Sequence, residues 1–120
     1  MKQQNMQFLR DFQVVHHPMD VPAKLVRQIE SDAQALAVAM RAGGHKCASV
    51  GAAIGKSEGY VSRLRSGERP IPDALVDALC RATGCNLIRQ YRDLCDALSD
   101  SSERREVDRL AAMLRQQVAA

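Results

Sequence analysis

The chain has 120 residues, of which 46% are hydrophobic, 26% are charged and only 3% are aromatic. This length and composition fit a single globular domain with an aliphatic core and a small appendage. No apolar run is long enough to span a membrane, and the first residues contain no apolar segment of a secretory signal. We therefore expect a cytoplasmic protein with no membrane partner.

The net charge of +3 is concentrated in the middle of the chain. Residues 1–40 are neutral overall, and residues 71–120 carry a net charge of −1. Residues 41–70 hold six basic and two acidic residues, which leaves a net charge of +4. This asymmetry indicates an anionic partner at the central segment, although a solvated basic loop would give the same pattern.

The cysteines do not predict a metal site. Cys47, Cys80, Cys85 and Cys95 are separated by 33, 5 and 10 residues, without the close-set pairs of a zinc ribbon. Cys80 and Cys95 fall on apolar helical faces, where a free thiol packs as a small hydrophobic group. We also find no phosphate-binding loop and no catalytic pairing of Cys with His. We therefore expect no metal, no cofactor and no enzymatic activity.

Apolar spacing and glycines predict about six helices and little or no strand. The first helical face begins near residue 20 and ends at Gly43–Gly44, with Ser31–Asp32 as a candidate break. Two short helices follow, over about residues 47–54 and 58–65. Gly55 separates them, and Ser57 is the expected N-cap of the second helix because its hydroxyl can accept a backbone N–H.

The remaining helices are predicted over residues 72–83, ending at Gly84, and over residues 87–98. The polar run Ser99–Ser102 predicts a break, after which a last helix begins near Glu103. Its apolar stripe has spacings of 3, 4 and 4 and consists of Val107, Leu110, Leu114 and Val118. This stripe could pack back on its own domain or form the seam of a dimer.

The central pair of short helices holds the most informative residues. Gly51 lies four residues before the joint at Gly55. A larger side chain at position 51 would collide with the second helix. Val61 and Leu64 point inward. The other face of the second helix is polar, which suits base edges and phosphates better than a core.

This stretch resembles the helix-turn-helix of the lambda-repressor and Cro family of regulators, often called the XRE family. Gly44 stands at the opening glycine of the family pattern, and Val50–Gly51 and Ile54–Gly55 stand where the family has Leu-Ala and Leu-Gly. Ser57 matches the capping serine, and Val61–Ser62–Arg63 takes the place of Ile-Ser-Arg. The sequence departs from the pattern at four positions, namely His45, Cys47, Gly59 and Arg65.

The resemblance implies an all-α, lambda-repressor-like bundle of about five helices with an extra C-terminal helix. We divide the chain accordingly into an N-terminal extension (residues 1–19), the helix-turn-helix domain (20–98) and the C-terminal helix (99–120), a possible dimerisation element. Family members usually form dimers that read two half-sites, so we expect a homodimer.

The resemblance also implies that the helix 57–65 enters the major groove of double-stranded DNA. The base contacts expected on this basis are Ser57, Glu58, Ser62 and Arg63. The expected phosphate contacts are Lys46, Lys56, Tyr60, Arg65 and Arg69. Arg63 is the strongest candidate for direct readout, because arginine can bind guanine through two hydrogen bonds.

The function expected from these features is that of a sequence-specific transcriptional regulator of bacterial or phage type, acting as a repressor. The alternative is an antitoxin-type DNA-binding protein whose terminal extension binds a partner protein, such as a toxin or a polymerase subunit.

Overall fold

The structure, a computed structural model, describes residues 17–119. Over this range the helices are α2 (Ala23–Val26), α3 (Asp32–Gly43), α4 (Cys47–Ile54), α5 (Glu58–Ser66), α6 (Asp73–Thr83) and α7 (Leu87–Ala119). The described residues contain no strand, only an isolated bridge between Met19 and Cys85. The predicted all-α class is confirmed over the described residues. None of the described helices is both long and apolar enough to cross a membrane.

Glycines in the left-handed conformation end the helices of the body. The residues that follow α3, α4, α5 and α6 are Gly44, Gly55, Gly67 and Gly84, with φ of 68°, 74°, 86° and 78°. Glycine adopts this conformation without the steric cost that other residues incur. The predicted helix ends at Gly44, Gly55 and Gly84 are therefore confirmed, and the C-cap of α5 is Gly67.

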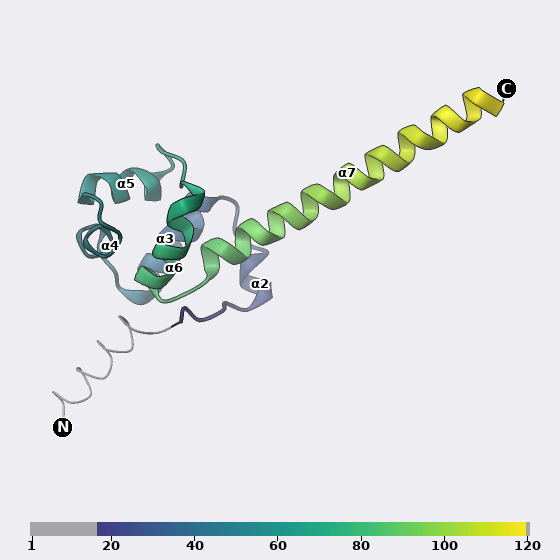
Figure 1. Ribbon diagram of the computed structural model, residues 1–120. Coiled ribbons are helices and arrows are strands. Elements are labelled where there is room, and N and C mark those ends of the chain that lie inside the picture. Colours follow the sequence, from purple (N-terminus) through teal and green to yellow (C-terminus); the bar gives the residue numbers. More distant parts are fainter. Residues whose placement is uncertain (1–16, 120) are drawn as a thin grey trace.

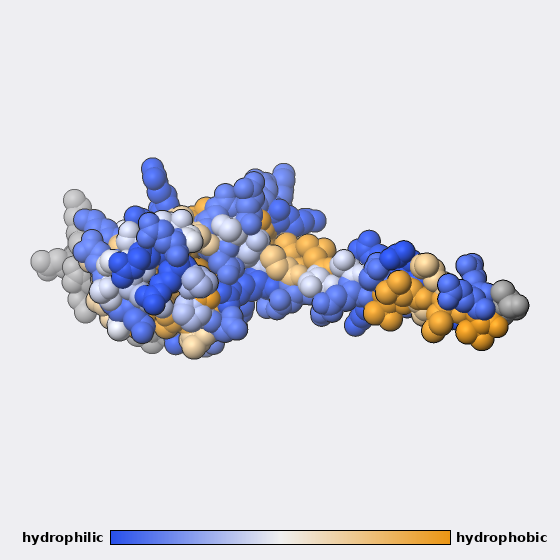
Figure 2. Space-filling model, turned by 90° about the horizontal axis from the view of Figure 1, so that it is seen from above, coloured by the Kyte–Doolittle hydropathy of each residue, from blue (hydrophilic) through white to orange (hydrophobic). Residues whose placement is uncertain are grey.

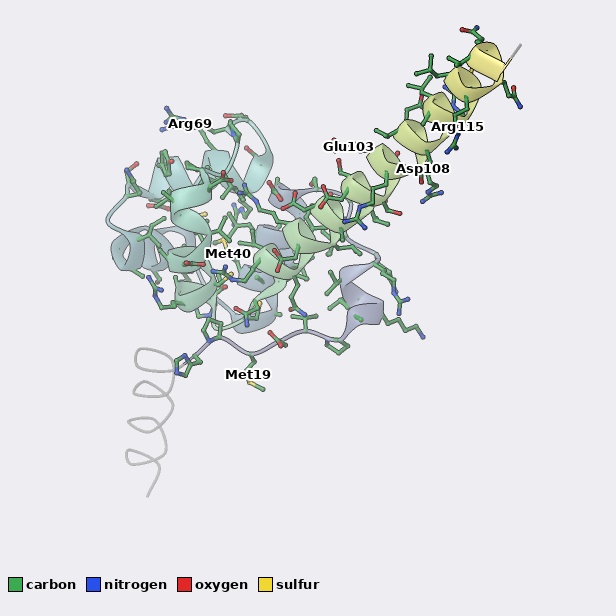
Figure 3. All side chains as sticks on the ribbon, turned by 45° about the vertical axis from the view of Figure 1, so that its right-hand side comes forward. Met19, Met40, Arg69, Glu103, Asp108 and Arg115 are labelled. Atoms are coloured by element: carbon green, nitrogen blue, oxygen red, sulfur yellow. The ribbon has the colours of Figure 1, made fainter. Side chains whose placement is uncertain are left out.

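The body, which we define as residues 18–94, encloses an aliphatic core to which every helix contributes. Helices α4 and α5 pack against each other, α5 also packs on α3, and α4 packs on α6. Helix α6 and the first turns of α7 pack together and on α3 (Figure 1). Figure 3 shows Met40 of α3 inside the body. The largest fully buried side chains are Leu36, Met40, Leu64, Leu79, Leu87 and Ile88.

Polar contacts fasten α7 and the N-terminal segment to the body. Arg92 pairs with Asp32 at the start of α3, at 3.0 Å, and with Asp73 at the start of α6. Burial lowers the pKa of Arg92, but the hydrogen bonds and charges of these two aspartates outweigh it and leave the pKa raised. The backbone of Met19 bonds to Gly84 at 3.0 Å and to Asn86 at 2.9 Å. Residue 19, expected in the N-terminal extension, thus belongs to the body, whereas residues 1–16 lie outside the described part of the chain.

Helix α7 is continuous through the segment where a break was expected. It runs for 33 residues and includes Ser99–Ser102, so the predicted break and separate last helix are wrong. Serine and aspartate lower helix stability by only a few tenths of a kcal/mol each, whereas helices stop reliably at Gly or Pro. No Gly or Pro follows Gly84 in the sequence.

The second part of α7, residues 95–118, projects from the body, and we call it the tail (Figure 1). Every side chain of the tail is exposed. Cys95 is among them, so its predicted packing is wrong, whereas Cys80 is buried as predicted and burial raises the pKa of its thiol. Figure 2 shows apolar surface gathered toward the far end of the tail.

Candidate nucleic-acid interface

Close packing at Gly51 fixes the joint between α4 and α5. A Cβ atom built on Gly51 would lie 2.6 Å from the carbonyl oxygen of Lys56, in the backbone of the turn. The backbone N–H of Lys56 also donates to the carbonyl of Gly51 at 2.8 Å. The predicted collision at this position is confirmed, with the obstacle in the turn that leads into α5 rather than in α5 itself.

Helix α5 is held by its cap and by its buried side. The backbone N–H of Tyr60 donates to the Ser57 hydroxyl oxygen at 3.1 Å, so the predicted N-cap is confirmed. Val61 and Leu64 are fully buried in the core. These contacts give α5 one fixed rotation about its axis, and therefore decide which of its residues face solvent.

The outward face of α5 consists of residues opposite Val61 and Leu64. Because successive residues of a helix advance by about 100°, this face contains Gly59, Ser62, Arg63 and Ser66. We call these four residues the α5 face. Ser62 is half-buried and the other three are exposed. Their spacing is i, i+3, i+4 and i+7.

Arg63 and Ser66 are linked within this face. The Ser66 hydroxyl donates to the carbonyl oxygen of Arg63 at 3.2 Å. A Cβ atom on Gly59 would lie 3.6 Å from a terminal guanidinium nitrogen of Arg63, an ordinary van der Waals distance. The Arg63 side chain thus lies back along α5 over Gly59. Ser66 lies outside the predicted helix 58–65, although its spacing of seven and four residues from Gly59 and Ser62 would have placed it on this face.

Tyr60 brings two predicted phosphate-contacting residues together at the edge of α5. The ammonium nitrogen of Lys56 lies 5.3 Å from the centre of the Tyr60 ring, and the guanidinium carbon of Arg69 lies 5.1 Å from it. Both distances fall within the range of cation–π attraction. The backbone N–H of Arg69 donates to the carbonyl of Arg63 at 3.2 Å, which folds the following loop back onto α5. Figure 3 shows Arg69 at the edge of the body.

Three other residues predicted to contact DNA, namely Glu58, Arg65 and Lys46, lie outside the α5 face and away from Tyr60. Glu58 and Arg65 are exposed on the flank of α5 opposite Tyr60, about 160° and 140° from it around the helix axis. Glu58 stands in the first turn, where a negative charge is favoured by the helix dipole. Lys46 precedes α4, and the eight residues of that helix, about 12 Å along its axis, separate it from the turn.

The basic residues of the central segment are exposed cations. Of the ion pairs among the described residues, none involves Arg41, Lys46, Lys56, Arg63, Arg65 or Arg69. By contrast, Arg89 pairs with Asp77, and Arg109 pairs with Glu106. The segment of net charge +4 therefore presents exposed cations that an external anion can bind.

Two positions where the sequence departs from the family pattern have structural roles. Cys47 is buried in the core cluster. The Nε2 atom of His45 lies 3.1 Å from the carbonyl oxygen of Thr83, so the ring ties the loop before α4 to the end of α6. Among the described residues, no three His, Cys, Asp or Glu side chains are grouped to hold a metal ion.

No family model matches this chain, and comparisons with curated proteins and with solved structures gave no match.

Proposed function

We propose that this protein binds double-stranded DNA in a sequence-specific manner and acts as a transcriptional repressor, with the helix-turn-helix fold of the lambda-repressor and Cro family. In this proposal α4 and α5 form the helix-turn-helix, and the α5 face enters the major groove. The observation that carries the proposal is a set of exposed cations, without an ion-pair partner among the described residues, around a helix whose rotation is fixed by the core.

The chemistry of the α5 face fits base edges. Arg63 offers a planar set of donors that matches the two acceptors of guanine, and the serine hydroxyls can donate or accept. Gly59 adds no side chain beside Arg63, so no side chain at this position crowds the guanidinium. The hydroxyl of Ser57 accepts the N–H of Tyr60, which leaves its own hydrogen free to bind a base or a phosphate.

The surroundings of the α5 face fit the phosphate backbone. Lys56 and Arg69 both contact the ring of Tyr60, so they lose less side-chain freedom on binding than unsupported cations would. Lys46, directly before α4, and Arg65, on the other flank of α5, extend the positive surface. Binding through such contacts weakens as the salt concentration rises, because the release of counterions from the DNA on binding then becomes less favourable.

The test is a selection of bound sequences from a random duplex library at low salt, followed by titration of the enriched site. We expect Arg63→Ala to weaken binding to that site by about 1–3 kcal/mol and to relax the preference at one base pair. Arg104→Ala is the matched control, since Arg104 is an exposed arginine of the tail and should leave the preference unchanged. A library without an enriched sequence, or an unchanged preference in Arg63→Ala, would contradict the proposal.

A further inference from the structure

The tail carries a row of exposed side chains whose character changes along its length. Counting from Asp96, one residue of this row occurs at every third or fourth position. The first three residues are acidic and the remaining four are apolar. In order, the row is Asp96, Asp100, Glu103, Val107, Leu110, Leu114 and Val118.

The apolar part of this row, residues 107, 110, 114 and 118, is the tail stripe. Its exposed fractions range from 50% at Leu110 to 79% at Val118. At about 100° per residue, the tail stripe lies roughly 180° around α7 from the side that Leu87, Tyr91 and Leu94 turn to the core. The stripe therefore does not continue the packed side of α7. Of the two expectations for the stripe, packing on its own domain does not occur among the described residues.

We propose that the tail stripe pairs with the tail stripe of a second copy of this chain, with the two helices antiparallel. The apolar spacing reads almost the same in both directions, so antiparallel helices can place Val107 opposite Val118 and Leu110 opposite Leu114. Each copy then covers all four apolar residues of the other. Ala111, beside the row, is small enough to let the two helices approach closely.

Charge decides the direction of pairing. In a parallel pair, the seam would continue toward the bodies and would place Asp100 and Glu103 opposite the same residues of the other copy. Like charges facing one another across a seam destabilise it. In the antiparallel pair the apolar segments overlap, and the acidic segments of the two copies lie at opposite ends. Figure 3 shows Glu103 on one side of the tail and Asp108 and Arg115 on the other, so those two charges do not face the seam.

The first test measures the mass of the purified full chain by sedimentation equilibrium over a concentration series without DNA. We expect the wild type to approach twice 13.2 kDa as the concentration rises. The double variant Leu110→Glu/Leu114→Glu should remain monomeric over the same series. The matched control Ala112→Glu/Gln116→Glu adds the same two charges to the opposite side of the tail and should dimerise like the wild type.

Helical content from circular dichroism identifies any variant whose tail has unfolded. A wild type that stays monomeric at every concentration would overturn the proposal and would leave the stripe to a different protein. Loss of dimers in both double variants would also overturn it, since the seam would then not be the stripe. Because DNA is absent, these outcomes are independent of the proposed function.

The second test determines the direction of pairing by disulfide formation in a Cys95→Ser background, which removes the exposed native thiol of the tail. We expect Val107→Cys chains to link to Val118→Cys chains when the two are mixed, and neither variant to link efficiently to itself. A disulfide requires Cβ atoms about 3.5–4.5 Å apart, so it reports directly on which positions are opposite. Efficient self-linking of each variant would show a parallel pair and overturn the antiparallel arrangement.

Discussion

The α5 face and the tail stripe are both exposed, but they differ in chemistry and in support. The α5 face holds polar and charged groups that water hydrates well, and the core fixes the helix from behind. The tail stripe holds apolar groups on the part of α7 that follows Leu94, the last residue of this helix packed against the core of the described residues. Burying one such side chain contributes about 1.5–3 kcal/mol. The α5 face is thus stable in water without a partner, whereas the stripe gains free energy only when it is covered.

The largest expected effect separates the body from the tail directly. Leu36→Ala removes a fully buried side chain from the core, so we expect the free energy of unfolding to fall by about 2–5 kcal/mol. Leu114→Ala, measured at concentrations where the chain is monomeric, should change it by less than about 0.5 kcal/mol. Urea unfolding followed by circular dichroism measures both. Equal losses in the two variants would show that the tail packs on the body.

A smaller effect tests how closely the scaffold behind the α5 face is packed. Gly51→Ala should cost about 1–3 kcal/mol, because its methyl group meets the backbone of the turn at Lys56. Gly59→Ala is the matched control on the exposed side of the same helix pair and should gain up to about 1 kcal/mol from its higher helix propensity. Thermal unfolding shows whether each variant is less or more stable than the wild type. If both variants gained stability, the close contact at Gly51 would not exist in solution.

The smallest effect compares two serines. Ser57→Ala removes the N-cap of α5 and should cost about 1 kcal/mol in the free energy of unfolding. Ser99→Ala changes an exposed serine inside α7, where no cap is needed, and should stay within about 0.5 kcal/mol of the wild type. A cost at Ser99 as large as that at Ser57 would indicate that α7 begins again near this residue, as the sequence pattern suggested. Chemical denaturation is precise enough to separate the two values.

Most of the body could be predicted from the sequence, because its helix ends depend on local chemistry. Glycines in the left-handed conformation and the hydroxyl of Ser57 act on the residues next to them. The error at Ser99–Ser102 has the same local origin. Serines resemble a cap in the sequence, but a cap also requires the preceding helix to end, and the chain after Gly84 has no residue that forces an end.

Exposure was harder to predict than helix formation. Periodicity placed Cys95 on an apolar face, but it could not show that the body ends one residue earlier, at Leu94. Likewise, the stripe of α7 was recognised, whereas the direction in which it points depends on how the first turns of α7 are anchored. That anchoring uses Arg92 and two aspartates about 20 and 60 residues away in sequence, a contact that no local pattern encodes.

The unbroken course of α7 makes the tail a spacer of defined length. The middle of the tail stripe, near residue 112, lies roughly 28 Å beyond Leu94 at the rise of an α-helix. Two chains joined antiparallel at this point would hold their bodies with attachment points roughly 55 Å apart, which exceeds the 34–36 Å of one turn of DNA. A flexible linker would let two bodies settle on neighbouring turns. A continuous helix instead sets a minimum reach, so a joined pair would favour DNA sites that lie farther apart.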